Sequence, residues 1–197
     1  MRIIRLFYRG FTWRKKTKEK IIYLTFDDGP TPELTPLILE LLDEYGWKAT
    51  FFCVGENVEK YPELYQEILN RGHRTGNHTF NHLNGFSSGI EEYVTNVRKA
   101  AEYIDSNLFR PPYGKIKRRQ KKQIKLDNYE IVMWDLFTRD YDKKQTPEAI
   151  LHKIKRLSRK GSIVLFHDSV KARNNVLAAF PRAIEFWNEQ GYRFGVL

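Results

Sequence analysis

Carboxylates and imidazoles follow short apolar runs in this chain of 197 residues. Asp27 and Asp28 come directly after the run that ends at Phe26, and His78 and His82 stand four residues apart in the segment HTFNH. Adjacent carboxylates are costly at the end of a strand unless a cation or an arginine offsets their charge. On a helical turn, histidines at this spacing share one face and can hold one metal ion. Two imidazole nitrogens and one carboxylate oxygen leave a coordination position for water, the pattern of a hydrolytic metal site.

Later apolar runs are also followed by groups that carry charge or transfer protons. An imidazole changes its charge near neutral pH, so a histidine can protonate a leaving amine, and a carboxylate off the metal can accept a proton from water. His73 precedes an arginine on an expected strand and is interpreted as structural, whereas His152 lies in a basic helix and is expected to be solvated. The groups after the later runs are Arg110, Asp135, Asp140, His167 and Asp168.

Apolar, β-branched runs alternate with stretches of helical spacing, which is typical of a parallel sheet whose strands are joined by crossover helices. Strands are predicted at residues 21–26, 49–54, 73–77, 108–110, 130–134, 162–166 and 192–196. Helices are predicted at residues 34–42, 61–69, 90–105, 116–126, 147–157 and 176–189.

The predicted fold is an α/β fold, a distorted and incomplete (β/α) barrel of about seven parallel strands with outer helices. A complete eight-unit barrel usually needs about 250 residues, which exceeds the 197 available. A doubly wound open sheet gives the same alternation and stays open as the alternative. Both architectures place chemistry at the carboxyl ends of the strands, so we expect the charged groups to converge there.

The positive charge is concentrated in two segments of the chain. The net charge is +10, of which residues 1–20 hold +7 and residues 115–125 another +7 without any acid. We interpret these segments as solvated faces first and as sites for anionic partners second. Nucleic-acid binding is not expected, because the second segment has no aromatic platform or reader motif beside it. A hydrophobic content of 41% excludes a disordered chain, and the predicted organisation is a basic extension at 1–20 before a catalytic domain at 21–197.

Arginines interrupt the apolar residues at the N-terminus, so the sequence contains no recognisable signal peptide. No run approaches the ~18 apolar residues that a membrane-spanning helix needs. We expect a cytoplasmic protein or one peripheral to the membrane, whose basic N-terminus contacts an anionic surface. The single cysteine, Cys53, lies in an apolar run and is expected to be a buried thiol. No protein partner is implied.

Five segments, taken in order, resemble the polysaccharide deacetylase family, which is carbohydrate esterase family 4 with its NodB homology domain. One such match is weak, whereas five in order and correctly spaced are strong evidence. The segments are LTFDDGP at 24–30, HTFNH at 78–82, RPPYG at 110–114, WDLFTRDY at 134–141 and VLFHD at 164–168.

The resemblance implies a metal site with a base beside it. Asp28, His78 and His82 would bind a divalent metal ion, for which Zn²⁺ is the first expectation and Co²⁺ or Ni²⁺ the alternatives. Asp27 would be the general base, and Arg110 would orient it.

The resemblance also implies an acid and a substrate-binding wall. His167 would be the general acid, paired with Asp140. The backbone N–H of Tyr113 would bind the oxyanion, and Leu165 would line the pocket for the acetyl methyl group. Tyr141 departs from the family pattern, which commonly has tryptophan there, so the shape of the sugar subsite is in question. The expected substrate-binding residues are Pro112, Tyr113, Trp134, Tyr141 and Leu165.

These residues predict a hydrolase, a metal-dependent N-deacetylase of N-acetylhexosamine-containing glycans such as peptidoglycan or chitin-type oligomers. The alternative is a deacylase of another acylated carbohydrate or of a small amide, because fold and metal do not choose the acyl carrier. A carbohydrate-binding module without catalysis would have lost part of the set, and none of it is missing. That set is Asp27, Asp28, His78, His82 and His167.

Overall fold

The computed structural model describes residues 10–197. Its strands are β1 (Ile21–Asp27), β2 (Thr50–Cys53), β3 (Arg74–Asn77), β4 (Leu108–Phe109), β5 (Glu130–Ile131), β6 (Leu136–Phe137), β7 (Ser162–His167) and β8 (Arg193–Gly195). Its helices are α2 (Thr35–Glu44), α3 (Gly55–Lys60), α4 (Pro62–Asn70), α5 (Ile90–Ala101), the 3₁₀ turn η1 (Pro112–Gly114), α6 (Arg118–Leu126), α7 (Pro147–Leu157) and α8 (Arg173–Glu189).

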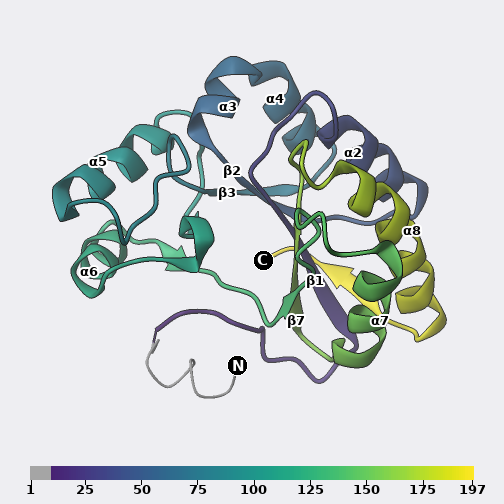
Figure 1. The fold of residues 1–197 in the computed structure, drawn as a ribbon. Coiled ribbons are helices and arrows are strands. Elements are labelled where there is room, and N and C mark those ends of the chain that lie inside the picture. Colours follow the sequence, from purple (N-terminus) through teal and green to yellow (C-terminus); the bar gives the residue numbers. More distant parts are fainter. Residues whose placement is uncertain (1–9) are drawn as a thin grey trace.

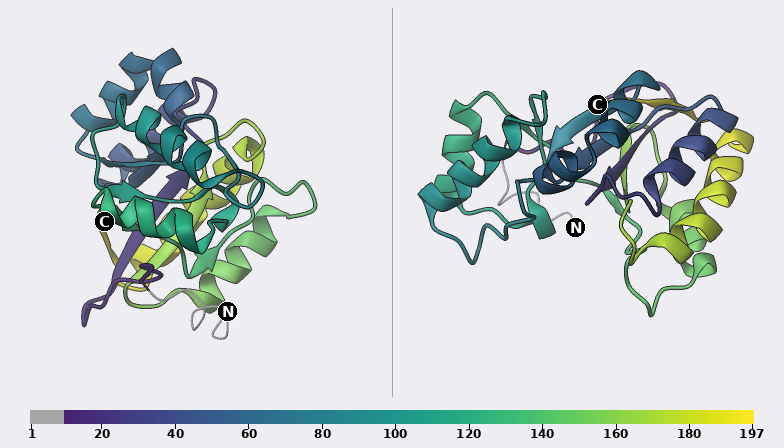
Figure 2. Two further views of the ribbon diagram at one scale, coloured as in Figure 1. Left: turned by 90° about the vertical axis from the view of Figure 1, so that its left-hand side faces the viewer. Right: turned by 90° about the horizontal axis from the view of Figure 1, so that it is seen from above.

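The strands form one parallel sheet that curves without closing. Their order is β5-β4-β3-β2-β1-β7-β6, so β5 and β6 lie at its two ends, and β8 pairs with the first half of β1. Figures 1 and 2 show the helices outside the strands, with α5 and α6 on one side and α2, α7 and α8 on the other. The prediction of a distorted, incomplete (β/α) barrel with outer helices is confirmed.

The side chains of β1 alternate between two faces, as a pleated strand requires. Ile22, Leu24 and Phe26 are fully buried in the apolar layer beneath α2, α4, α7 and α8. Thr25 and Asp27 lie on the opposite face of β1. A separate apolar cluster fixes α5 and α6 against β4 and β5; its members are Tyr93, Val94, Val97, Phe109, Ile116, Ile124 and Ile131.

Three short elements, α3, η1 and β6, were not predicted. Each has two to six residues, which is too short to show a hydrophobic period in the sequence. The predicted strand at 130–134 is also shorter than expected. β5 ends at Ile131, and Val132 forms a bridge with Thr12 instead, while the N–H of Asp135 donates to the carbonyl of Ile163. Contacts between distant segments decide these boundaries.

The segment before β1 is hydrogen-bonded to the barrel. Thr12 forms a parallel bridge with Val132, and Arg14 an antiparallel bridge with Ser162. This segment runs along the lower edge in Figure 1 and joins the region after β5 to the start of β7. The predicted boundary between residues 20 and 21 stays a prediction.

The described residues include no helix that is both long and apolar enough to cross a membrane. The predicted membrane contact of the basic N-terminus falls largely on residues 1–9, outside the described residues, and stays a prediction.

Candidate active site

Parallel strands deliver the predicted site residues to one edge of the sheet. β1 and β7 are neighbours, with Asp27 opposite His167. β3 and β4 are also neighbours, and His78 and Arg110 each follow directly after the last residue of their strand. Pairing of the two strands therefore brings these residues close together. The carboxyl ends of parallel strands lie on the same side, as the sequence analysis expected. The predicted roles are considered below from the contacts of each side chain.

Asp28, His78 and His82 form a cluster that fits one metal ion. One ligand atom from each residue lies within 4.8 Å of the other two. Asp28 Oδ1 is 3.2 Å from Nε2 of His82 and 3.7 Å from Nε2 of His78. Burial works to raise the pKa of Asp28, but its hydrogen bond to His82 and the neighbouring imidazole charges lower this pKa well below its usual range. An ionised oxygen beside two imidazole nitrogens is a donor set that Zn²⁺ and similar cations accept.

The imidazole of His78 is held in the tautomer that a metal ligand needs. Its Nδ1 lies 2.7 Å from the carbonyl oxygen of Arg110. A carbonyl oxygen only accepts, so Nδ1 carries the proton and Nε2 keeps the lone pair that a metal ligand needs. Burial lowers the pKa of His78 to about 4, against the opposing attraction of Asp27. A neutral imidazole coordinates a cation without first losing a proton.

The two histidines do not lie on a helical turn, which corrects the expectation from their spacing. Residues 78–84 form an irregular segment in which Thr79 and His82 have left-handed backbone conformations, with φ of 67° and 57°. This backbone brings the two imidazole centroids to 5.1 Å. Left-handed non-glycine residues cost roughly 1 to 3 kcal/mol each and persist where the surrounding structure fixes them. Asp28 and Tyr113 share this property, with φ of 85° and 59°.

Asp27 is buried and bound on one side by a guanidinium group. Arg110 Nη1 donates to Asp27 Oδ1 at 2.6 Å and to the hydroxyl of Thr25 at 2.8 Å. The other carboxylate oxygen of Asp27 lies 3.8 Å from His78 Nε2 and so borders the ligand cluster. Arg110 is fully buried, and its remaining donors reach the carbonyls of Val132 and Met133. The arginine therefore fixes the carboxylate in one orientation.

His167 is paired with a second buried carboxylate. His167 Nδ1 lies 2.6 Å from Asp140 Oδ1, and the backbone N–H of His167 donates to the other oxygen of Asp140 at 2.7 Å. Burial works to lower the pKa of His167, but the charge and hydrogen bond of Asp140 outweigh it and raise the pKa to about 9. The imidazole is therefore protonated at neutral pH, with Nε2 as its remaining N–H.

Aromatic rings border His167. Tyr141 meets the imidazole edge-on at 4.9 Å between centroids, and Phe137 lies at 6.1 Å. Trp134 lies 5.3 Å from Phe137 and extends this wall. Leu165 stands two residues before His167 and therefore lies on the same face of β7. Phe137 was not predicted as a site residue, although its position inside the fourth motif was a usable signal.

The third motif forms the η1 turn beside His82. Pro112 is buried, whereas Tyr113 is 60% exposed and its hydroxyl lies 3.1 Å from His82 Nδ1. Gly114 has φ of 67°, and a Cβ there would lie 3.0 Å from the ring of Trp134. The turn therefore packs its glycine against the aromatic wall and leaves the tyrosine at the mouth of the site.

Comparison with known proteins decides the family. The model of the polysaccharide deacetylase family matches residues 14–132. A peptidoglycan-N-acetylglucosamine deacetylase of Bacillus cereus is 36% identical over 190 residues, which cover 93% of this chain and 89% of that protein. The chain belongs to the polysaccharide deacetylase family. It is accordingly a hydrolase of the polysaccharide N-deacetylase class, a family that depends on a divalent metal.

Two further relatives of the deacetylase agree with this assignment. A chitooligosaccharide deacetylase of Azorhizobium caulinodans is 34% identical over 166 residues, covering 81% of this chain and 79% of that protein. The crystal structure of a peptidoglycan N-acetylglucosamine deacetylase, in complex with a naphthalenyl N-hydroxybenzamide, superimposes with a TM-score of 0.87 at 31% identity. The match covers 95% of this chain and 91% of that one.

Asp168 is a positioning residue of the deacetylase to which sequence reasoning gave no role. Its buried carboxylate accepts from the N–H of Gly29 at 2.8 Å and from the hydroxyl of Thr35 at 2.8 Å, which ties the end of β7 to the turn after Asp28. A Cβ at Gly29 would lie 1.8 Å from this carboxylate, so only glycine fits there. The burial that raises the pKa of Asp168 to about 7 also keeps water from this link. In the sequence, the FDDGP segment and the His167–Asp168 pair were the features that could have indicated this role of Asp168.

Asp135 plays a structural part in the deacetylase. Its carboxylate accepts from Arg159 Nε at 3.0 Å and from the N–H of Ile163 at 3.0 Å. These contacts hold Asp135 at the start of β7, whereas the predicted site residues lie at the carboxyl ends of the strands. An acid after a predicted strand was thus not sufficient to indicate catalysis.

Proposed function

We propose that the deacetylase removes N-acetyl groups from N-acetylglucosamine units of peptidoglycan, with Zn²⁺ held by Asp28, His78 and His82. The observation that carries this proposal is the position of Asp27 and His167, register partners on β1 and β7 beside the ligand cluster. An acid and a base on neighbouring strands can act on the two ends of one scissile amide. The names of the Bacillus cereus relative and of the crystallised deacetylase support peptidoglycan as the polymer.

A divalent cation at this site supplies Lewis-acid polarisation of the amide carbonyl and lowers the pKa of water. Asp28 would hold it with an ionised oxygen, and His78 and His82 would hold it with their Nε2 atoms. Zn²⁺ suits this mixed nitrogen and oxygen donor set, and Co²⁺ or Ni²⁺ are the alternatives.

Asp27 acts as the general base. Arg110 occupies its Oδ1, so the oxygen beside the ligand cluster is the one that accepts a proton from the attacking water. The guanidinium group orients the carboxylate and offsets its charge in a buried site. Proton transfer to a positioned base contributes about 10² to 10⁴ in rate.

His167 acts as the general acid. Asp140 engages its Nδ1, so Nε2 is the atom that delivers a proton to the departing amine. The backbone N–H of Tyr113 donates to the oxyanion, and a donor of this kind contributes about 3 to 4 kcal/mol. Leu165 lines the acetyl pocket on the same strand face as His167. Pro112, Trp134 and Tyr141 form the walls that receive the sugar.

The second candidate is a deacylase of another acylated carbohydrate or of a small amide. It is favoured by Tyr141, which is 40% exposed and stands where the family commonly has the larger tryptophan. A smaller ring with a hydroxyl group alters the subsite next to His167 and with it the accepted acyl carrier.

Acetate release tests these proposals. The purified protein is stripped of metal, reloaded with Zn²⁺ or Co²⁺, and incubated with peptidoglycan, N-acetylglucosamine oligomers, acetylxylan and a non-sugar acetamide. We expect metal-dependent release from peptidoglycan at the highest rate. Release from acetylxylan or the simple amide alone would refute the first candidate and favour the second, and no metal-dependent release from any of these substrates would refute both.

A further inference from the structure

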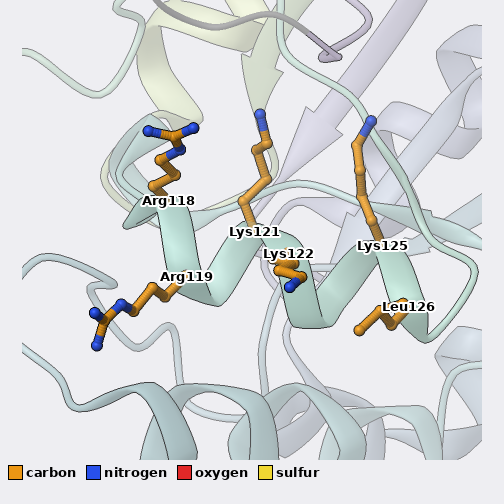
Figure 3. Close-up of a pocket in the computed structure, with 6 residues that line it drawn as sticks. All are labelled: Arg118, Arg119, Lys121, Lys122, Lys125 and Leu126. Atoms are coloured by element: carbon orange, nitrogen blue, oxygen red, sulfur yellow. The ribbon is translucent and has the colours of Figure 1, made fainter.

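Helix α6 presents a dense row of cations that the proposed chemistry does not use. Its exposed or half-exposed cations are Arg118, Arg119, Lys121, Lys122 and Lys125, here called the α6 basic face. Together with Leu126 they line a surface hollow of about 570 Å³ (Figure 3). In Figure 3, Arg118, Lys121 and Lys125 extend from one side of the helix and Arg119 from the other.

The acids near α6 are already engaged elsewhere. Asp127 accepts two hydrogen bonds from Arg98, both at 2.9 Å. Glu130 accepts from Thr12 at 2.7 Å and from Lys15 at 3.2 Å. Within residues 10–197, Arg118, Arg119, Lys122 and Lys125 have no carboxylate within 4.0 Å. The charge of the α6 basic face is therefore largely unneutralised.

This arrangement works against the stability of the helix. Arg118 and Arg119 occupy the first turn, at the positive end of the helix dipole, and no acid stands there. Arg118 and Lys122, like Lys121 and Lys125, are like charges four residues apart, which destabilise a helix by about 0.2 to 0.5 kcal/mol a pair. Burial, Lys125 and Arg118 lower the pKa of Lys121. The cations are thus not explained by the fold of α6.

The geometry of α6 does not suit a membrane or a nucleic acid. Its inward-facing residues, Gln120 and Ile124, are fully buried, and Leu126 is the one apolar side chain of α6 that is exposed. A helix that lies in a bilayer interface needs an exposed apolar face. Single-stranded nucleic acid needs free aromatic rings for stacking, whereas Lys121 Nζ lies over the ring of Phe11 at 4.9 Å.

The α6 basic face begins at the rim of the candidate active site. Gln120 Nε2 donates to the carbonyl of Gly85 at 2.9 Å, and Lys117 Nζ donates to that of Ser88 at 2.7 Å. These bonds fix the first turn of α6 to the segment that follows His82. Lys115 Nζ lies 6.0 Å from the ring centre of Tyr113. A glycan that extends from the metal cluster past Tyr113 therefore meets Lys115, and the α6 basic face follows it in the chain.

We propose that the α6 basic face binds the carboxylate groups of an anionic N-acetylated glycan and so directs the enzyme to a carboxylate-bearing polymer rather than a neutral one. The inference rests on the proposed function and names its substrate class. Residues 1–20 and 115–125 each carry +7 of the net +10, so the remainder of the chain has a net charge of −4. A polyanion is repelled by that remainder and attracted to these two segments, of which the α6 basic face lies in the second, and the peptide carboxylates of peptidoglycan supply such charges.

The test separates charge recognition from catalysis by measuring binding and activity on two polymers. The α6 variant carries R118Q, R119Q, K122Q and K125Q. The control variant carries K155Q and R156Q in α7, and a matched pair variant carries R119Q and K122Q. Each protein is sedimented with insoluble peptidoglycan and with chitin at low and high salt, and KM is measured on soluble peptidoglycan strands and on neutral N-acetylglucosamine oligomers.

We expect the α6 variant to show a roughly tenfold higher KM on the carboxylated strands, with KM on the neutral oligomers unchanged. On the carboxylated strands, the KM of the pair variant should lie between those of the wild type and the α6 variant, and the KM of the α7 control should equal that of the wild type. Salt raises the wild-type KM on the carboxylated strands more than that of the α6 variant. The melting temperature of the α6 variant should equal or exceed that of the wild type, because repulsion between like charges on the helix has been removed.

Equal peptidoglycan binding by the wild type and the α6 variant would overturn the inference, and so would a KM increase on both polymers alike. Retention by anionic lipid vesicles or by DNA, lost in the α6 variant while peptidoglycan binding persists, would overturn it in favour of those ligands. Salt-sensitive peptidoglycan binding that needs α6, without acetate release from any glycan, would support the α6 surface and refute the proposed function alone.

Discussion

Asp27 and Asp28 are adjacent in the chain, yet their carboxylates have different partners. Asp27 is bound to the buried guanidinium of Arg110, whereas Asp28 faces the imidazoles of His78 and His82. We expect Asp27→Asn to keep metal binding nearly intact and to lower kcat by about 10² to 10⁴, because a base is lost and not a ligand. His82→Ala should weaken metal affinity at least tenfold to a hundredfold.

Metal affinity is measured by competition with a chromophoric chelator, and kcat by acetate release at saturating metal. The Arg110–Asp27 contact must survive in the amide variant, which a crystal structure of it would establish. Equal metal loss in the two variants would contradict the division between base and ligand.

The Asp140–His167 pair predicts the alkaline side of the pH profile. His167 is active as an acid only when protonated, and its pKa of about 9 keeps it so at neutral pH. Asp140→Asn removes the charge that raises this pKa, so the high-pH fall of kcat/KM should move from near pH 9 toward the ordinary value of 6.5. The profile is measured on a neutral oligomer at fixed metal saturation. An unshifted alkaline limb would exclude His167 as the titrating acid.

Asp28, His78 and His82, which several motifs brought together, lie within 4.8 Å of one another, whereas residues that stood alone were harder to interpret. The cluster of Asp28 with two histidines followed from five ordered motifs. Asp135 and Asp168 both follow strands, and their structural contacts with Arg159, Ile163 and Gly29 depend on chain segments far away in sequence. No local pattern carries that information.

At the scale of elements, the order of the strands determines where the site residues lie, and the conformation of the loops determines how their side chains meet. The helix at Pro147–Leu157 was predicted with its exact bounds, since proline opens it and its apolar spacing is regular. The helical turn assumed for His78 and His82 was wrong. Left-handed residues such as Thr79 produce that geometry, and they leave no mark on hydrophobic periodicity.

The connection into β3 contains a buried histidine that should make stability depend on pH. His73 Nδ1 accepts from the N–H of Ala49 at 3.2 Å. Burial, helped by Lys48, lowers the pKa of His73 to about 4 from 6.5. The unfolded chain therefore binds more protons than the folded one between these values, and stability rises with pH across that window. The stabilisation is complete above pH 6.5 and is lost as pH falls toward 4.

His73→Gln removes this titration. We expect the wild type to lose roughly 2 kcal/mol relative to the variant between pH 7 and pH 4.5, in addition to any constant difference. Urea unfolding of metal-free protein at a series of pH values measures it, and the remaining histidines are common to both proteins. A difference in unfolding free energy that stays constant with pH would rule out His73 as the source.

At the scale of the whole molecule, the open barrel leaves a gap that the N-terminal segment spans. β5 and β6 end the strand order, and the segment before β1 contacts the chain on either side of that gap. Residue counting and strand patterning predicted an incomplete barrel, but a basic sequence gave no sign that residues 12–15 join the sheet. Charge describes solubility and attraction, whereas backbone pairing depends on the partner segment.

Two truncations test whether this segment belongs to the folded body. Deleting residues 1–9 keeps the hydrogen bonds that Thr12 and Lys15 make to the barrel, so this truncation is the reference for the longer one. Deleting residues 1–20 removes the bonds from Thr12 N–H to Ile131, from Met133 N–H to Thr12 and from Lys15 N–H to Gly161. Each is worth about 0.5 to 1.5 kcal/mol, which predicts a loss on the order of 3 kcal/mol. Equal urea midpoints for both truncations would instead show that residues 10–20 are dispensable for stability and would support a boundary at residue 21. In that case water would satisfy the backbone groups freed by the longer deletion at no cost in free energy.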